Sequence, residues 1–150
     1  MEKVDYIIVG AGSAGCALAY RLAASSNFNV LLLEAGSPAR NPMLHIPLGF
    51  AFLLKPHKNN WNYRTQAEPH LNQREIDLPR GKVLGGCSAI NGMVYVRGQA
   101  ADYNRWAELG NVGWSYENVL PYFKRSEDCE NGANTFHGTG GPLWVGNVKN

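Results

Sequence analysis

Hydrophobic positions at the start of the chain predict a strand, a helix and a second strand in quick succession. Val4 to Val9 is an apolar run with β-branched members, which is typical of a buried strand. Cys16 to Ala24 is rich in Ala and Leu and predicts a helix. Val30 to Leu33 is a second short apolar run. Residues 3–36 are therefore predicted to form a β-α-β unit.

The pattern changes after this unit. Six of the eight prolines lie in the loop region 37–80, which excludes long helices and central strands there. Leu48 to Leu54 predicts a short helical turn, and Trp61 to Thr65 and Gln73 to Leu78 predict two short strands. Because so long a loop is unusual in a compact domain, we expect it to wrap a ligand or to reach another domain.

A helical segment is predicted over residues 100–130. Ala100 to Leu109 places aromatic and apolar side chains on one face, and Gly110 is a typical helix stop. Ser115 is a favourable N-cap for a second helix.

Pro121 is expected to divide that second helix, because an internal proline removes a hydrogen bond and clashes with the preceding turn. The prediction is a break near Leu120 and a new helix from Pro121 to about Ser126. A polar, Gly-rich loop follows at 131–141, and a strand is expected over 141–146.

Composition narrows the class of protein. The chain has 150 residues, 45% of them hydrophobic, which suffices for a domain with a real core. A net charge of +2 gives no indication of a nucleic acid or an anionic membrane as partner. Because the strand pattern begins at Val4, no signal peptide is expected, and no apolar run is as long as a membrane span. Three cysteines without metal-site spacing, Cys16, Cys87 and Cys129, are expected to be reduced thiols in a cytoplasmic protein.

Three glycines directly after the first predicted strand suggest a dinucleotide site. Gly10, Gly12 and Gly15 have the spacing G-x-G-x-x-G. They permit a tight turn, close approach of the backbone to a pyrophosphate, and packing of helix on strand. Glu34, at the end of the second strand, is placed to accept hydrogen bonds from ribose hydroxyls and would repel the 2′-phosphate of NADP. This context favours a nucleotide site over a coincidental Gly-rich turn.

Residues 80–98 form a second Gly-rich stretch, with Gly81, Gly85, Gly86 and Gly92. Such a backbone can lie flat against a planar ring system and direct N–H groups toward it. The alternative is a Gly-rich turn that leads into a buried helix or strand. Composition alone leaves both interpretations open.

These motifs resemble the glucose-methanol-choline (GMC) oxidoreductase family of FAD enzymes, over nearly the whole chain. Residues 5–15 resemble the family's FAD fingerprint. Residues 81–104 resemble its first signature, with Gly-Lys-x-Leu-Gly-Gly-x-Ser-x-Ile-Asn at the centre. Segments 106–127 and 137–145 are most similar to the choline dehydrogenase and alcohol dehydrogenase branch. Cys87 departs from the Ser or Thr that is common at its position.

The resemblance implies an α/β fold, in which a Rossmann-like FAD-binding βαβ unit carries long loop-rich excursions. Only two strands of the doubly wound sheet are convincing, so the sheet is expected to be incomplete. Residues 1–150 would be the N-terminal part of a discontinuous FAD-binding domain in a larger two-domain fold. Residues 80–98 would be its flavin loop, and the strand at 141–146 would begin the substrate domain.

The resemblance also implies a cofactor site for FAD. The first Gly-rich loop would hold the diphosphate, Glu34 with Ala35 the adenosine ribose, residues 81–88 the diphosphate and flavin, and residues 91–94 the isoalloxazine. The expected binding residues are Gly10, Ala11, Gly12, Ser13, Ala14, Gly15, Glu34, Ala35, Gly81, Val83, Gly85, Gly86, Ser88, Asn91, Gly92, Met93 and Val94. Some members attach FAD covalently to a His at the position of Ile90, so non-covalent FAD is expected here.

The implied reaction is oxidation of a primary alcohol, choline-like or other, to an aldehyde by hydride transfer to flavin N5. The family's catalytic histidine and its His or Asn partner lie near the family's C-terminus, so no catalytic residue is expected in these 150 residues. The electron acceptor (oxygen, quinone or another carrier) stays open. The four histidines present have no paired acid at a catalytic spacing and are expected to be loop residues: His45, His57, His70 and His137.

Other interpretations remain. The chain could be an NAD-binding Rossmann module, although residues 81–91 have no use in one, or a truncated, non-catalytic FAD-binding fragment. A photochemical decarboxylase on the same fold is a remote alternative. Cys87 is expected to be a small packing residue. Lys82 is expected either to stabilise an anionic flavin or a phosphate, or to be solvated or salt-bridged. Three aromatic residues are expected in the core rather than in a substrate cage: Trp61, Tyr95 and Trp106.

Overall fold

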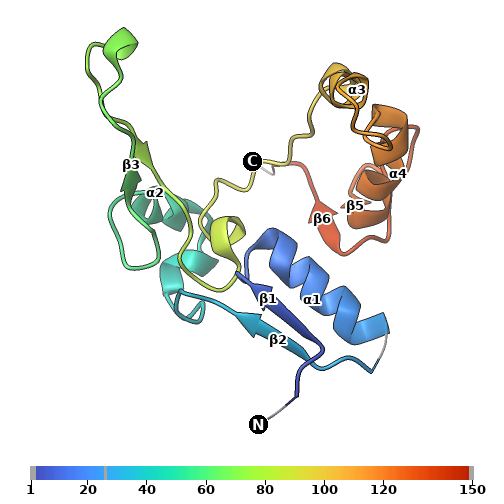
Figure 1. Ribbon diagram of the computed structural model, residues 1–150, viewed down its shortest axis with the longest axis horizontal. Helices are drawn as coiled ribbons and strands as arrows, with labels where there is room; N and C mark the ends of the chain where they lie inside the picture. The colour runs from blue at the N-terminus through green and yellow to red at the C-terminus, as the bar shows by residue number, and fades with distance from the viewer. Residues whose placement is uncertain (1–2, 26, 149–150) are drawn as a thin grey trace. The chain divides into compact units, whose positions relative to one another are not determined.

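The computed structural model describes residues 3–25 and 27–148 and divides into two compact units (Figure 1). The first unit ends at Val94 and the second begins at Tyr95. Within the described residues, the first contains two two-stranded sheets and the second contains one. None of the described helices is long and apolar enough to cross a membrane.

The predicted β-α-β unit is confirmed. Strand β1 (Tyr6–Val9) pairs in parallel with β2 (Val30–Leu33), with Tyr6 opposite Val30, and helix α1 (Ser13–Ser25) connects them. The helix begins before the predicted Cys16, because the N–H of Cys16 already donates to the carbonyl of Gly12 at 2.9 Å. The Gly-rich loop therefore leads directly into the first turn of α1.

Short elements fill residues 37–80, as the proline density predicts. They are the 3₁₀ turns η1 (Pro42–His45), η2 (Pro47–Gly49) and η3 (Pro69–Leu71), helix α2 (Phe50–Leu53), and strands β3 (Tyr63–Arg64) and β4 (Asp77–Leu78). The strands pair antiparallel and form an arm with a helical turn near its tip (Figure 1). Strand β4 is shorter than predicted, because Asn72 and Gln73 have φ of 56° and 57° and form a turn.

The core of the first unit lies where this loop region meets the second Gly-rich stretch. Leu53, Val83 and Ile90 are almost fully buried and pack together. The stretch itself forms a turn into the short 3₁₀ helix η4 (Gly86–Ala89), and residues 91–99 have no regular structure. The Gly-rich stretch thus forms a turn and a short helix, and its expected contact with a planar ring system stays a prediction.

The second unit contains two helices and a small parallel sheet. Helix α3 (Ala100–Glu108) is followed by Gly110 at φ +98°, and helix α4 (Tyr116–Ser126) is capped by the Ser115 side chain. Strand β5 (Glu127–Cys129) pairs with β6 (Leu143–Val145). The predicted Ser115 cap, the helix stop at Gly110 and a strand within residues 141–146 are confirmed. The predicted helix end at about Ser126 is also confirmed, and residues 127–129 of the segment 100–130 form β5.

The predicted break at Pro121 is wrong, because α4 runs through it. A proline at this position deprives the carbonyl of Glu117 of its helical partner. Glu117 and Pro121 both lie on the exposed face of α4, where water can take that hydrogen bond. Pro121 is tolerated because the carbonyl that loses its helical hydrogen bond faces solvent and can bind water.

Candidate functional site

An open cavity of about 810 Å³ lies at the carboxyl ends of β1 and β2. Its volume is in the range of cofactor and ligand sites. Six of the predicted residues line it: Gly10, Gly12, Glu34, Ala35, Gly81 and Gly86. Six residues that were not predicted as cofactor ligands complete the wall: Val9, Leu33, Trp61, Tyr63, Arg80 and Cys87.

The first glycine loop has the backbone that its sequence predicts. Gly10 has φ +95°, and a Cβ on Gly15 would collide with the carbonyl oxygen of Gly10. The first N–H groups of a helix have no partner within it, so the start of α1 offers donors and a positive dipole end to an anion. Ser13 and Ala14 are exposed there.

Glu34 has a role that the motif did not predict. One carboxylate oxygen accepts the N–H of Ala11 and the other accepts the N–H of Gly36, each at 2.8 Å. Ala11, within the loop, is fully buried. Glu34 thus fastens the glycine loop to the end of β2 while it lines the cavity. Its expected contact with a ribose stays a prediction.

The two glycine-rich stretches, about 70 residues apart in sequence, touch at this cavity. The N–H of Gly85 donates to the carbonyl of Ala11 at 2.8 Å. A Cβ on Gly86 would lie 2.8 Å from the Cα of Gly12, closer than real Cβ atoms come to backbone. The contact therefore requires glycine at position 86, which also has φ +57°.

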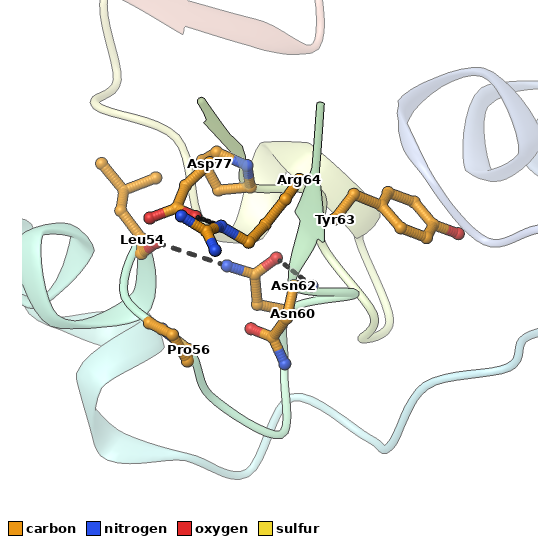
Figure 2. A pocket seen from close by; sticks show the side chains of 8 residues that line it. Leu54, Pro56, Asn60, Asn62, Tyr63, Arg64 and Asp77 are labelled. Atoms are coloured by element: carbon orange, nitrogen blue, oxygen red, sulfur yellow. Dashed lines mark hydrogen bonds and ion pairs between the residues drawn. The ribbon is translucent and has the colours of Figure 1, made fainter. Parts of the chain in front are cut away.

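Two buried asparagines hold the second stretch in place, and sequence reasoning missed them. Asn60 Oδ1 accepts the N–H of Arg80 at 2.9 Å, and its amide donates to the carbonyl of Leu53 at 3.4 Å. The same amide donates to the carbonyl of Leu54 at 3.4 Å (Figure 2). The backbone carbonyl of Asn59 accepts the N–H of Lys82 at 2.8 Å, and the Asn59 side-chain amide donates to Ser37 Oγ at 3.1 Å. The sequence signal for them is a pair of adjacent asparagines inside a proline-rich loop. A side-chain amide can donate to one backbone segment and accept from another, and so can join the two.

A small pocket beside Asn60 does not extend the site. Its volume is about 50 Å³, and Arg64 and Asp77 on its wall pair with each other at 2.9 Å (Figure 2). This space admits water but no cofactor.

The remaining predicted residues do not line the cavity. Val83 is buried in the core, and Ser88 Oγ donates to the carbonyl of Gly85 at 2.6 Å. Met93 and Val94 are 60% and 81% exposed, and Asn91 Oδ1 accepts the N–H of Met93 at 2.9 Å. The other predicted residues that are absent from the lining are Ala11, Ser13, Ala14, Gly15, Gly85 and Gly92.

The alternatives given for Lys82 stay predictions; its ammonium lies 4.5 Å from the centre of the Trp61 ring. Two other expectations for side chains are wrong. Cys87 is exposed rather than packed, and its sulfur accepts the N–H of Gly81 at 3.4 Å. Trp61 and Trp106 are 40% and 45% exposed and so lie outside the core.

A second polar cluster lies in the second unit, around Glu127. Its fully buried carboxylate accepts Arg97 Nη2 at 2.5 Å and the N–H of Gly138 at 3.0 Å through one oxygen. The other oxygen lies 2.8 Å from His137 Nδ1, so the expectation that His137 has no paired acid is wrong.

Burial raises the pKa of the Glu127 carboxyl, but the hydrogen bonds from His137 and Gly138 and the charge of Arg97 outweigh it, so this pKa lies below its ordinary value. Ligand atoms of Glu127, Cys129 and His137 lie within 4.8 Å of one another. Because both carboxylate oxygens are already bound by protein donors, we interpret the cluster as structural.

Comparison with known proteins gives the same family as the motifs. The chain is 51% identical over 150 residues to a protein of Sinorhizobium fredii (strain NBRC 101917 / NGR234) named oxygen-dependent choline dehydrogenase, covering 99% of this chain and 27% of that protein. A protein of the same name from Rhizobium meliloti (strain 1021) is 49% identical with the same coverage. The chain thus spans about a quarter of the length of these curated relatives.

Solved structures confirm the α/β fold class. Pyridoxine 4-oxidase from Mesorbium loti matches with a TM-score of 0.88 and 36% identity, over 95% of this chain and 28% of that one. Formate oxidase matches with a TM-score of 0.82 and 31% identity, over 95% and 26%. Residues 4–149 match the family model described as GMC oxidoreductase, and the chain belongs to that family.

Proposed function

We propose that this chain is the FAD-binding part of an oxidoreductase that oxidises a primary alcohol, choline-like or other, to an aldehyde. The observation that carries the proposal is the contact of the two glycine-rich stretches at one cavity, Gly86 against Gly12. Each stretch belongs to a motif of the family, and the curated relatives are named choline dehydrogenases. When bound, FAD supplies a hydride acceptor for the alcohol carbon.

The residues present fit FAD. The start of α1 supplies N–H donors for a diphosphate, and glycines keep Cβ atoms out of the cradle where a backbone must approach closely. Glu34 lies at the cavity and can offer its remaining lone pairs to ribose hydroxyls. In this proposal residues 10–15 hold the diphosphate, Glu34 and Ala35 the adenosine, and residues 81–94 the flavin side.

Non-covalent binding forms part of the proposal. Ile90 stands at the position of covalent attachment in some relatives, and its side chain is 3% exposed within the core and carries no nucleophile.

The substrate domain and the catalytic base are proposed to belong to sequence outside these residues, because the relatives are about four times longer. The exposed apolar side chains of the first sheet support an incomplete domain: Ile7 is 60% and Val9 83% exposed. On this proposal the 150 residues bind FAD without turnover. The electron acceptor stays open. Free Cys16, Cys87 and Cys129 support a reducing, cytoplasmic location.

The test is the visible absorption spectrum of the purified chain, with and without added FAD, after gel filtration. We expect flavin bands that stay with the protein and are released by acid precipitation. Flavin that remains on the precipitate would contradict non-covalent binding. A folded chain that retains no flavin would contradict the proposed site, and NAD binding by that chain would favour the Rossmann-module alternative.

A further inference from the structure

Two Asn-Gly pairs occur in the chain, Asn91-Gly92 in the second Gly-rich stretch and Asn131-Gly132 in the loop after β5. Such a pair is chemically labile, because the backbone nitrogen of the glycine can attack the side-chain carbonyl of the asparagine, and no Cβ on the glycine obstructs the approach. Both asparagines are exposed. The two pairs are alike in sequence, so their surroundings decide which one reacts.

The backbone around Asn91 is arranged for this attack. Asn91 Oδ1 accepts the N–H of Met93 at 2.9 Å, which folds the side-chain carbonyl forward over the intervening Gly92. The N–H of Gly92 makes no hydrogen bond to any residue that the structure describes, so the attacking nitrogen is free. The Met93 N–H donates to the same oxygen on which negative charge develops during the attack, and it therefore stabilises that charge.

The second pair is held away from reaction. The N–H of Gly132 donates to the carbonyl of Cys129 at 3.0 Å, so its nitrogen is already engaged. Asn131 Oδ1 accepts the side-chain amide of Asn147 at 2.9 Å, which ties the Asn131 side chain to the residues after β6. Ring closure at Asn131 has to break the first bond and move the side chain out of the second.

We propose that Asn91 is a self-modification site, at which the folded chain converts this asparagine to aspartate and isoaspartate. The Gly92 nitrogen forms a bond to Cγ of Asn91, and the Cγ–Nδ2 bond breaks. The proton of the Gly92 nitrogen leaves with the side-chain amide group as ammonia. Water then opens the resulting cyclic imide at either of its two carbonyls, so one water is consumed for each ammonia released.

The products change residue 91 in two ways. Both carry a negative charge where the asparagine was neutral. Isoaspartate also adds a methylene to the main chain, directly after Ile90, whose side chain is 3% exposed in the core. Residues 91–94 belong to the flavin side of the proposed site. Modified chains are therefore expected to retain less FAD, a consequence that rests on the proposed function.

The experiment incubates the full chain at mildly alkaline pH and follows both sites by peptide mass spectrometry. Trypsin separates them, because residues 83–97 and residues 126–149 fall in different peptides. We expect the mass gain of amide-to-acid conversion at Asn91 several times faster than at Asn131. Labelling by an isoaspartyl methyltransferase should find isoaspartate in peptide 83–97. The same chain unfolded in urea is the matched control, and its two sites should react at similar rates.

Gly92→Ala tests the chemistry directly. A Cβ on Gly92 would lie 3.8 Å from Phe50 Cε2, which is an ordinary contact, so the variant should fold. It should slow the reaction at Asn91 severalfold, because the added methyl group obstructs the attacking nitrogen. Equal rates at Asn91 and Asn131 in the folded wild type would overturn the inference, as would a Gly92→Ala variant that reacts as fast as the wild type.

The effect on the cofactor is measured separately with Asn91→Asp, which carries the charge of the product from the start. We expect the folded variant to retain less FAD than the wild type after gel filtration, and equal retention would overturn this consequence. A folded, unmodified wild-type chain that binds no FAD would instead contradict the proposed function, whereas the reaction rates at Asn91 and Asn131 test the modification without any cofactor.

Discussion

Gly86 is the residue at which the two glycine-rich stretches meet, and replacing it tests their contact. Gly86→Ala combines left-handed backbone, φ +57°, with a Cβ 2.8 Å from the Cα of Gly12. Backbone strain and overpacking together should lower the free energy of unfolding by about 3 kcal/mol. FAD retention should be lost in the same variant. Urea unfolding and a flavin spectrum measure the two effects.

Gly132 provides the control for this variant. It has φ +85°, but nothing lies within 4 Å of a Cβ built there. Gly132→Ala should therefore cost only the backbone strain, about 1 kcal/mol, and leave FAD retention intact. Equal costs in the two variants would show that the contact with Gly12 contributes nothing.

Glu127 makes the stability of the second unit dependent on pH. Its folded-state pKa lies below its ordinary value, despite burial, because His137, Gly138 and Arg97 stabilise the carboxylate. A depressed pKa contributes stability that is fully present above the unfolded-state pKa, about 4.3. That contribution is lost as the pH falls through the folded-state value.

Glu127→Gln should lower the free energy of unfolding by about 3 kcal/mol at pH 7, because it leaves the Arg97 side chain, which is only 11% exposed, without its counter-charge. The difference from wild type should shrink as the pH falls below about 4.3, because the Glu127 carboxylate of the unfolded wild-type chain then binds a proton that the folded chain takes up only at lower pH. Denaturant unfolding at pH 7, 5, 4 and 3 measures it. A difference that stays constant over this range would argue against the carboxylate as the source.

At the residue scale, the role of a residue was predictable where it depends on the local backbone conformation. It was less predictable where it depends on a contact with a residue far away in the sequence. Gly10 and Ser115 meet a turn and a helix start, and both behave as predicted. The pairing of His137 with Glu127 joins residues that lie 10 apart across a loop, so spacing did not reveal it. Glu34 likewise binds Ala11, 23 residues away, in a contact that no local pattern encodes.

Among the elements, the β3–β4 arm is fixed at its base by Asn60 rather than by its exposed ion pairs. Asn60 is 4% exposed, and its amide contacts two carbonyls and two N–H groups. Asn60→Asp would place a carboxylate against the carbonyls of Leu53 and Leu54. We expect it to cost about 3 kcal/mol of unfolding free energy and to weaken FAD binding.

Replacing the charged Asp77 on the arm by a neutral asparagine should change the free energy of unfolding very little. Asp77 pairs with Arg64 at 2.9 Å, but the two side chains are 66% and 60% exposed. Asp77→Asn should change the unfolding free energy by about 0–1 kcal/mol. Urea unfolding compares Asn60→Asp with Asp77→Asn directly. A larger loss of stability in Asp77→Asn would show that the ion pairs, rather than Asn60, hold the arm in place.

Elements with a strong apolar pattern were predicted well, whereas polar ones were not. Strand β2 has the predicted bounds because it is a continuous apolar run. Strand β5 reads Glu-Asp-Cys, and the burial that stabilises it comes from the Arg97 and His137 contacts rather than from apolar side chains. Helix α4 continues through Pro121 because the chain has an exposed face there, which the sequence alone does not specify.

For the whole molecule, the α/β class followed from the β-α-β pattern, but the meeting of residues 10–12 with residues 85–86 did not. That contact joins segments about 70 residues apart and depends on the asparagine bonds that hold the intervening loop. The predicted plan assigned residues 1–150 to the N-terminal part of a discontinuous FAD-binding domain, with the strand at 141–146 beginning the substrate domain, and that assignment stays a prediction; the division into two units after Val94 had no counterpart in it.

This division leads to a prediction for the whole chain. Every proposed FAD-binding residue lies at or before Val94, in the first unit, whereas the Glu127 cluster lies in the second. A ligand that binds only folded protein stabilises it by about 2.7 kcal/mol at 100 times its Kd. For a unit of about 94 residues this should raise its unfolding temperature by about 10 °C or more.

Calorimetry of the chain should therefore show two transitions, of which saturating FAD moves one. Glu127→Gln should lower only the transition that FAD leaves in place, and Gly86→Ala only the one that FAD moves. The two variants serve as each other's control, since each carries a single substitution in one unit. A single transition, or equal shifts of both transitions with FAD, would mean that the units unfold as one body and that cofactor binding stabilises the whole chain.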